Sequence, residues 1–258
     1  MLRLFFVIFI SLPFVIYYMV KVIYYIRHEE RYTEEERYNL ALKMIRIMKR
    51  NGRIHTISYG QDRLPEKNGY IMYPNHQGKY DALGIIDAHE RPCTVVIDDK
   101  ASHAPITSQF IDLLRGVRLD KTDMRKQVKS IRGIAEEVKG GRNFIIFPEG
   151  GYEHNGNSLQ EFLAGAFKCA QMSRSPIVPV AIYDSYKVFS INSIRKVRTQ
   201  VSFLEPIFYE EYKGMNTLSI AQLVKQRIEE EMKKLSVLEQ EYNQDWMNIE
   251  GGESGSAG

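Results

Sequence analysis

The chain is predicted to be an α/β protein, with a mixed, largely parallel sheet flanked by helices and an N-terminal hydrophobic membrane-anchoring helix. From Ile54 onward, short apolar runs alternate with longer segments of helical periodicity. Several of these runs are apolar throughout, as strands covered by helices on both faces must be. The third observation is a long uncharged segment at the amino terminus of an otherwise polar chain. With 258 residues, the chain can form one such domain and one appendage.

The uncharged segment runs from Leu4 to Val20, and a helix of these 17 residues spans roughly 25 Å. Snorkelling of the Arg3 and Lys21 side chains would extend that reach. Pro13 near its centre leaves two arrangements open, a kinked spanning helix or a hairpin that enters one leaflet. Basic residues are more numerous after the segment than before it. We therefore expect localisation at a membrane, with the rest of the chain on the cytoplasmic face.

Four segments are expected along the chain. Residues 1–31 form the membrane anchor, 32–53 an amphipathic basic helix at the membrane surface, 54–243 the main domain and 244–258 a flexible tail. Thr33 and Glu36 have the spacing of a capping box, which predicts the start of the second helix. The basic residues in its second half are expected to interact favourably with the negative end of the helix dipole and to attract anionic lipid headgroups. The tail is predicted from its run of Gly and Ser.

Within the main domain, the apolar runs predict strands and the helical patterns predict helices. The expected strands are Ile54–Tyr59, Tyr70–Tyr73, Cys93–Ile97, Asn143–Phe147, Ile177–Ile182 and Gln200–Phe203. The expected helices are Ala82–Ala88, Thr107–Leu114, Met124–Lys139, Leu159–Gln171 and Ser219–Leu235.

Composition argues against several function classes. The formal net charge of +3 is too small for a nucleic-acid-binding profile, so no nucleic-acid partner is expected. No metal-binding motif occurs in the sequence, and neither a metal nor another cofactor is predicted. Cys93 and Cys169 lie in apolar stretches and are expected to be buried thiols in a reducing compartment.

Asn75-His76, followed five residues later by Asp81, is the most informative pattern in the chain. Pro74 disfavours a helix just before it, so His76 is expected on a loop at the exit of a strand. Ligands of alternating α/β sheets usually bind at that edge. A histidine there can act as a base near neutral pH, and a nearby carboxylate can orient it. Taken alone, the pair is weak evidence, because most His and Asp residues in loops are simply solvated.

Two other loops carry candidate binding residues. In Gly116-Val-Arg-Leu-Asp-Lys121, the cations Arg118 and Lys121 are expected on one face of a short extended segment, where they could hold a phosphate. The alternative is a solvated basic edge. In Phe147-Pro-Glu-Gly-Gly-Tyr152, glycines allow backbone N–H groups to approach a ligand, and Glu149 is expected at the same sheet edge as His76. An ordinary strand-to-loop turn is the alternative for this loop.

In their order and spacing, these segments resemble the glycerolipid acyltransferase family that includes the 1-acylglycerol-3-phosphate acyltransferases. The family's Asn-His-x-x-x-x-Asp block is matched by Asn75, His76 and Asp81. Its second block ends in Asp-Arg, and Asp120-Lys121 stands here. Its Phe-Pro-Glu-Gly-Thr-Arg block is matched through Gly150, and its Val-Pro-Val-Ala block is present at 178–181. The resemblance covers roughly residues 54–209.

The resemblance implies a membrane-bound O-acyltransferase that moves a fatty acyl group from acyl-CoA or acyl-carrier protein to lysophosphatidic acid, giving phosphatidic acid. His76 would be the general base and Asp81 would orient it, with no enzyme nucleophile. The sequence agrees with this implication, because it contains no Gly-x-Ser-x-Gly elbow. The implied partners are a lysophospholipid acceptor, the acyl donor and the lipid bilayer. The substrate-binding set would be Asn75, Arg118, Lys121, Glu149, Gly150 and Gly151.

Two departures from the family pattern concern the acceptor. Tyr152 replaces an Arg that helps bind the acceptor's phosphate in the family, and Lys121 keeps a charge but loses the bidentate fork of an Arg. We therefore expect Arg118 and Lys121 to bind the phosphate together, with help from the amides of Gly150 and Gly151. The alternatives are an acyltransferase for another lysophospholipid, a catalytically silent lipid-binding protein, or a thioester hydrolase.

Overall fold

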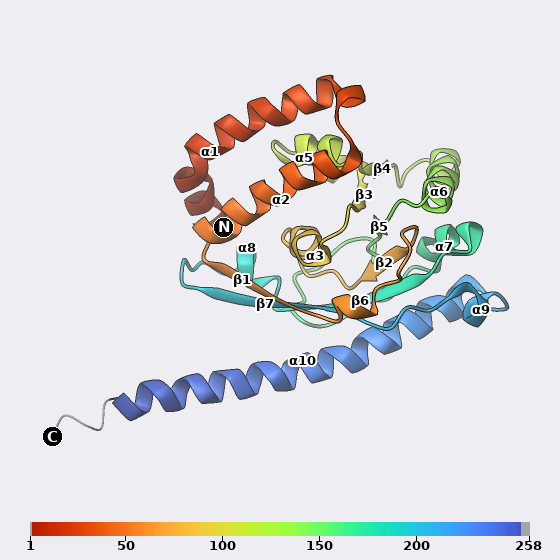
Figure 1. Cartoon of the computed structure of the whole chain (residues 1–258). Coiled ribbons are helices and arrows are strands. Elements are labelled where there is room, and N and C mark those ends of the chain that lie inside the picture. Colours follow the sequence, from red (N-terminus) through yellow and green to blue (C-terminus); the bar gives the residue numbers. More distant parts are fainter. Residues whose placement is uncertain (1, 254–258) are drawn as a thin grey trace.

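The structure is a computed structural model that describes residues 2–253 (Figure 1). Its centre is a seven-stranded sheet in the order β1-β7-β6-β2-β5-β3-β4. The strands are β1 (Ile54–Tyr59), β2 (Ile71–Pro74), β3 (Thr94–Asp98), β4 (Val117–Leu119), β5 (Phe144–Ile145), β6 (Ile177–Tyr183) and β7 (Val197–Phe203). All neighbouring pairs are parallel except β6 and β7. The predicted mixed, largely parallel α/β sheet is confirmed.

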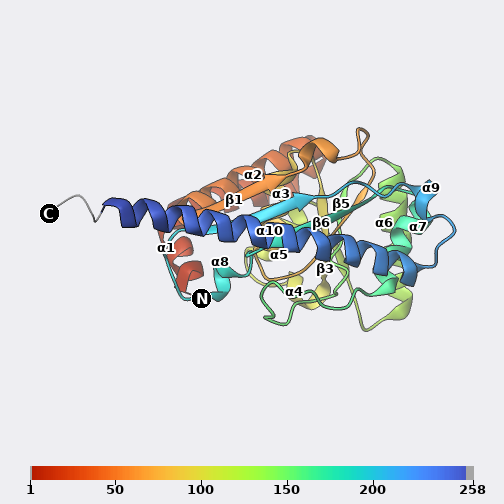
Figure 2. The same ribbon diagram turned by 90° about the horizontal axis from the view of Figure 1, so that it is seen from below.

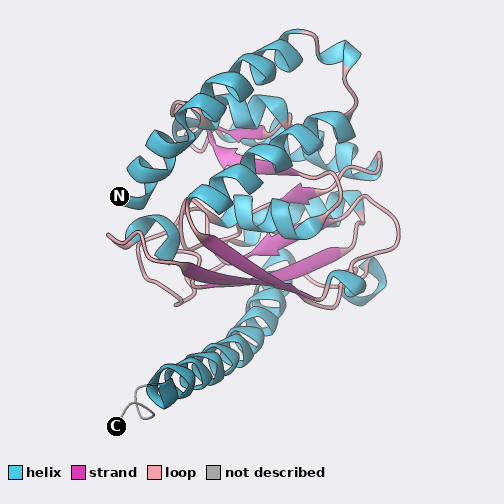
Figure 3. Ribbon diagram, turned by 60° about the vertical axis from the view of Figure 1, so that its left-hand side comes forward, coloured by secondary structure: helices cyan, strands magenta, loops and turns pink. Residues whose placement is uncertain are grey.

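Helices cover both faces of the sheet (Figures 1 and 3). One face packs against α2 (Glu34–Asn51), α3 (Asp81–His89) and α5 (Thr107–Leu113), and the other against α6 (Met124–Lys139), α7 (Lys168–Ser173) and α10 (Thr217–Glu253). The strand residues divide accordingly. Met72 joins the core beneath α2, α3 and α5, while its neighbours Ile71 and Tyr73 join the core beneath α6 and α10. This alternation follows from the two-residue period of a strand.

A long N-terminal helix, three short helices and three 3₁₀ turns complete the described residues. The α-helices are α1 (Leu2–Arg27), α4 (Asp99–Ser102), α8 (Lys187–Ser190) and α9 (Tyr209–Tyr212), and the 3₁₀ turns are η1 (Glu29–Arg31), η2 (Gln61–Arg63) and η3 (Ala164–Phe167). The predicted capping box of α2 is confirmed, since Thr33 and Glu36 exchange side-chain-to-backbone hydrogen bonds. Cys93 and Cys169 are buried free thiols, as expected.

α1 lies over α2 and α5 as the outermost layer of the molecule (Figure 1). The buried Val7 and Val22 face the domain, while much of the rest of the helix is apolar and exposed. Its segment Phe9–Arg27 is long and apolar enough to cross a membrane, with a mean hydropathy of 1.7. The expected snorkelling of Arg3 is wrong. Arg3 is 2% exposed, and its guanidinium donates to the backbone carbonyls of Lys187, Val188 and Arg195.

Two expected helices have different bounds. The segment predicted as Leu159–Gln171 is helical only in η3 and α7, because residues 159–163 are held by the loop after β5: the Leu163 N–H donates to the Pro148 carbonyl. The helix predicted to end at Leu235 continues in α10 to Glu253 and extends past the sheet (Figure 2). Residues 244–253 of the expected flexible tail are therefore helical, and 254–258 lie outside the described residues.

Candidate active site

The loop between β2 and α3 carries the Asn-His-x-x-x-x-Asp pattern. Asn75 leaves the strand fully buried, and its amide clamps the neighbouring strand β6: Nδ2 donates to the Ile182 carbonyl at 3.0 Å, and Oδ1 accepts from the Ile182 N–H at 2.7 Å. We expected Asn75 among the substrate contacts. With both amide groups engaged, its side chain instead fixes where the loop leaves the sheet.

His76 and Asp81 form a hydrogen-bonded pair. The distance from His76 Nδ1 to Asp81 Oδ2 is 2.8 Å, and the Asp81 side chain is completely buried. Because a carboxylate can only accept, Nδ1 carries the proton and Nε2 is left as the basic nitrogen. The His76 side chain is 18% exposed, so it is anchored on one side and accessible on the other.

The carboxylate of Asp81 accepts hydrogen bonds from several donors besides His76. Its Oδ2 also accepts the N–H groups of Gln77 and Gly78, and its Oδ1 accepts the hydroxyl of Ser185. Asp81 is in addition the first residue of α3, where the helix favours negative charge. These bonds fix the carboxylate, which in turn fixes the tautomer and orientation of His76.

The imidazole of His76 contacts two aromatic rings from the loop after β5. Phe147 stacks on it with ring centroids 4.2 Å apart, and Tyr152 meets it edge-on at 4.8 Å. Burial raises the pKa of Tyr152, and the nearby negative charge of Asp81 adds to that effect. Tyr152 therefore stays neutral at physiological pH, and its ring packs against the imidazole of His76.

Glu149 joins this loop to the loop after β2. Its carboxylate accepts the backbone N–H of His76 at 3.0 Å and the amide of Gln160 at 2.8 Å. The side chain is 8% exposed, and burial raises the pKa of Glu149 while its hydrogen bonds oppose the shift. Glu149 lies at the same sheet edge as His76, as expected, and its contacts hold the two loops together.

The two glycines after Glu149 differ. Gly150 has a φ of +72°, and a Cβ there would lie 2.7 Å from Leu163 Cδ1, so a side chain is excluded by both backbone and packing. Gly151 is exposed, and a Cβ there would meet nothing within 4 Å. Only the first glycine is required by the local structure.

The expectation that Arg118 and Lys121 share one face is wrong. Side chains of an extended segment repeat every two residues, and these two are three apart. Arg118 pairs with Asp112 at 2.7 Å and bonds Ser102 and Ser108. The Lys121 ammonium instead pairs with Asp98 at 2.9 Å and donates to the Gly150 carbonyl. Only Lys121 joins the loop that contacts His76.

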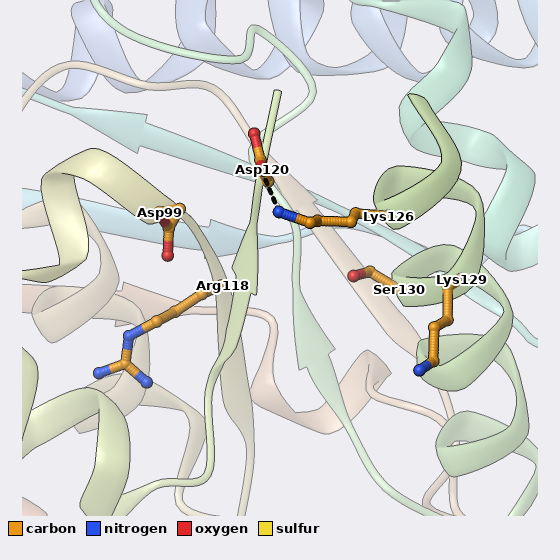
Figure 4. A pocket seen from close by; sticks show the side chains of 6 residues that line it. All are labelled: Asp99, Arg118, Asp120, Lys126, Lys129 and Ser130. Carbon is orange, nitrogen blue, oxygen red and sulfur yellow. Dashed lines mark hydrogen bonds and ion pairs between the residues drawn. The ribbon is translucent and has the colours of Figure 1, made fainter. Parts of the chain in front are cut away.

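Arg118 borders an open hollow of about 270 Å³ beside β4 (Figure 4). Figure 4 shows Arg118 and Asp99 on one side of the β4 segment, and Lys126, Lys129 and Ser130 from α6 on the other. Lys126 is paired with Asp120 at 3.2 Å. Hydrogen bonds from Thr122 and the charge of Lys126 hold the pKa of Asp120 at about 2. The carboxylates that line the hollow balance much of its positive charge.

Sequence reasoning missed several polar residues of the site. Gln77 is buried, and its side chain bonds Asn157, the Ile182 carbonyl and the Ser185 N–H. Ser185 is buried and reaches Asp81 from a segment more than a hundred residues away in the chain. The position of Gln77 between His76 and Asp81 could have identified it as a site residue. No local sequence pattern identifies Ser185 or Gln160. Within residues 2–253, no group of three or more His, Cys, Asp or Glu residues is arranged to hold a metal ion.

Comparisons with known proteins find curated relatives of this chain. The chain is 28% identical to the 1-acyl-sn-glycerol-3-phosphate acyltransferase of Saccharomyces cerevisiae over 133 residues, which are 51% of this chain and 44% of that protein. It is 27% identical to the enzyme of the same name from Salmonella typhimurium over 149 residues, 57% of this chain and 60% of that protein. The chain thus spans about half the length of the curated relatives it matches.

The fold has a counterpart among solved structures. The 1-acyl-sn-glycerophosphate acyltransferase PlsC from Thermotoga maritima superposes with a TM-score of 0.74, over 91% of this chain and 95% of that one, at 19% sequence identity. The family model described as Acyltransferase matches residues 55–183, which include the loops after β2, β4 and β5. The chain therefore belongs to the acyltransferase family.

Proposed function

We propose that this protein transfers a fatty acyl group from a thioester to the free hydroxyl of lysophosphatidic acid, forming phosphatidic acid. The observation that carries the proposal is the pairing of His76 Nδ1 with the buried Asp81, which leaves Nε2 as an oriented base. The names of the relatives support the same acceptor.

The pair supports a direct transfer without an acyl-enzyme. As the acceptor oxygen attacks the thioester carbonyl carbon, Nε2 of His76 takes the hydroxyl proton, and Asp81 stabilises the imidazolium that forms. When the tetrahedral intermediate collapses, the carbon–sulfur bond breaks and the imidazolium returns the proton to the departing thiolate. The products are the ester and a free thiol, and His76 is again neutral.

Lys121 is our candidate for the acceptor's phosphate. Its side chain is 45% exposed, and it contacts the Gly150 carbonyl in the loop that carries Glu149 and Tyr152. A phosphate could replace Asp98 as the partner of the Lys121 ammonium in a charge-assisted hydrogen bond. The backbone amide of Gly151 would add a donor beside it, whereas the Gly150 N–H, also expected to help, already donates to the Phe147 carbonyl at 3.2 Å. Arg118 is assigned to the hollow beside β4, because Asp112 neutralises it.

The exposed apolar face of α1 is proposed to lie in the bilayer interface, which brings the lipid substrates to the sheet edge. Phe9 is 79% exposed, Val20 66% and Tyr17 63%, and such side chains bind lipid when they cover one side of a helix. Because α1 also packs along α2 and α5, we favour insertion into one leaflet, on the cytoplasmic side, over a span that leaves the domain. Either acyl-CoA or acyl-carrier protein would then reach the site from the aqueous side.

The test is acyl transfer by detergent-solubilised protein, with labelled acyl-CoA or acyl-carrier protein and a panel of lysolipids. His76→Ala should lower the rate of phosphatidic acid formation by about 10²–10⁴-fold, the range for a general base. His55→Ala is the matched control, because His55 is an exposed residue of β1 away from the loop after β2. An active His76→Ala protein would contradict the mechanism.

One observation favours a second acceptor. Tyr152 places an aromatic ring, and no charge, against His76, so a lysophospholipid with a larger headgroup could be the preferred substrate. Competition between lysophosphatidic acid and other lysophospholipids in the same assay separates the two acceptors. Transfer to a different lysolipid alone would retain the role of His76 and replace the acceptor.

A further inference from the structure

A hollow of about 160 Å³ lies in the groove between α1 and α2, apart from the candidate active site. α1 packs on the outer side of α2, which covers one face of the sheet (Figures 1 and 3). The residues that line the hollow are Lys21, Tyr25, Glu36, Asn39, Leu40 and Lys43. Two of them are cations from different helices, and two others carry neutral hydrogen-bond donors.

The two cations of the hollow differ from other basic residues of α2. Arg46 and Lys49 share one carboxylate, Asp87, so each already has an anionic partner within the protein. Within the part of the chain that the structure describes, Lys21 and Lys43 form no ion pair. The Lys21 ammonium lies only over the Tyr25 ring, 5.7 Å from its centroid. These two charges are therefore available to an anion.

The single carboxylate that lines the hollow, Glu36, is already hydrogen-bonded to Thr33 at the start of α2. Glu36 Oε2 accepts from the backbone N–H of Thr33, which is one bond of the capping box, and from the Thr33 hydroxyl. The lining thus carries two cations against one anion that is held by hydrogen bonds. An anion that enters the hollow meets net positive charge.

The hollow adjoins the apolar face of α1. Val20, next to Lys21, is 66% exposed, and Tyr17 and Tyr24, at helical spacings around Lys21, are 63% and 45% exposed. Acyl chains can cover these side chains, while the phosphate of the same lipid lies within reach of the lysines. We propose that the groove between α1 and α2 binds the phosphate of an anionic phospholipid between Lys21 and Lys43. The assignment to lipid rests on the proposed membrane contact of α1, and it does not depend on acyl transfer.

The experiment compares binding of the full-length protein to phosphatidylcholine vesicles with and without phosphatidylglycerol, measured by flotation. Wild type should prefer the vesicles that contain phosphatidylglycerol. Lys21→Gln/Lys43→Gln should lower that preference by roughly tenfold or more, given the attraction of basic residues to anionic surfaces. The matched control is Arg125→Gln/Arg132→Gln, which removes two exposed charges from α6 on the other face of the sheet and should keep the preference.

Further variants separate the possible outcomes. Lys21→Arg/Lys43→Arg should retain the preference, since it keeps both charges. An unchanged vesicle preference in the folded Lys21→Gln/Lys43→Gln protein would refute the proposed site. An equal loss of preference in the α6 control would also refute it, because general charge attraction would then explain the binding. If inorganic phosphate bound wild type and not the Lys21→Gln/Lys43→Gln protein, while wild type bound both kinds of vesicle equally, the site would bind free phosphate and the lipid assignment would fail. Loss of acyl transfer with the vesicle preference intact would refute only the proposed enzymatic activity.

Discussion

The loop after β2 is buried and its polar groups bond inward, whereas the loop after β4 is exposed and its cations pair with nearby carboxylates. Asp81 has no exposed side-chain surface and accepts four hydrogen bonds. Lys121 is 45% exposed and has two contacts. In the proposed mechanism, the first loop orients a base before any substrate arrives. The second loop would have to exchange an internal partner for a ligand.

This difference sets what a substitution should change. A preorganised group acts in the transition state, so its loss lowers kcat. A cation that trades a carboxylate for a phosphate contributes to binding, so its loss raises KM. The following variants test this division, from the largest expected effect to the smallest.

Asp81→Asn should lower kcat by about 10²–10⁴-fold with little change in KM for the acceptor, because an amide can leave His76 in the wrong tautomer. Steady-state kinetics with lysophosphatidic acid measure both constants. Thermal melting must show that the variant is folded, since Asp81 also accepts backbone N–H groups of its loop. A change confined to KM would break the comparison.

Lys121→Ala should raise KM for lysophosphatidic acid by about tenfold while kcat falls less, as for the loss of one charged contact. Arg118→Gln serves as the contrast, because Arg118 is paired with Asp112 and should change that KM by less than about twofold. If both variants raised KM equally, the two cations would act together after all. An unchanged KM in Lys121→Ala would exclude it from phosphate binding.

Ser185→Ala should lower kcat by only about threefold to tenfold, the loss expected from one neutral hydrogen bond to a positioned carboxylate. The pH–rate profile of this variant should shift as well, because loss of the Ser185 hydroxyl changes how strongly Asp81 stabilises the His76 imidazolium. Ser185→Thr keeps the hydroxyl and should restore part of the rate. A wild-type profile in Ser185→Ala would mean that the bond to Asp81 contributes only to packing.

Glu149→Gln should alter the pH dependence of stability more than the rate. Burial raises the pKa of Glu149, so its protonated form is favoured in the folded state. The folded protein therefore loses stability as pH rises from the unfolded pKa through the raised value. Thermal melting from mildly acidic to neutral pH should show a flatter profile in Glu149→Gln than in wild type. Glu66→Gln, at an exposed position, should retain the wild-type profile.

The parts that the sequence predicted well depend on local chemistry. Apolar runs identified the buried strands, and Pro74 and the spacing of His76 and Asp81 identified the loop and its pair, since these features act over a few residues. The helix expected at Leu159–Gln171 failed because its first part is bonded to the loop after β5. Ser185 could not be found from a pattern, because its contact with Asp81 exists only in the folded sheet.

The charged residues show the same limit. Arg3 was expected at a lipid headgroup, yet three backbone carbonyls from residues 187–195 surround its guanidinium. Arg118 and Lys121 were expected to bind one phosphate together, yet Arg118 pairs with Asp112 and Lys121 pairs with Asp98. Long side chains reach whichever partner the fold supplies, and that partner is distant in sequence.

The pairing of β1 with β7 has a consequence for how the protein is made. Ile54 lies opposite Val197, so the first strand of the sheet has its neighbour only after the last strand has left the ribosome. The carbonyls that receive Arg3 are also synthesised late. The two N-terminal helices are therefore complete before β7 and the carbonyls that receive Arg3 exist. If α1 contacts the bilayer as proposed, it can do so during translation, and the last strand then joins a sheet whose N-terminal helices are already at the membrane.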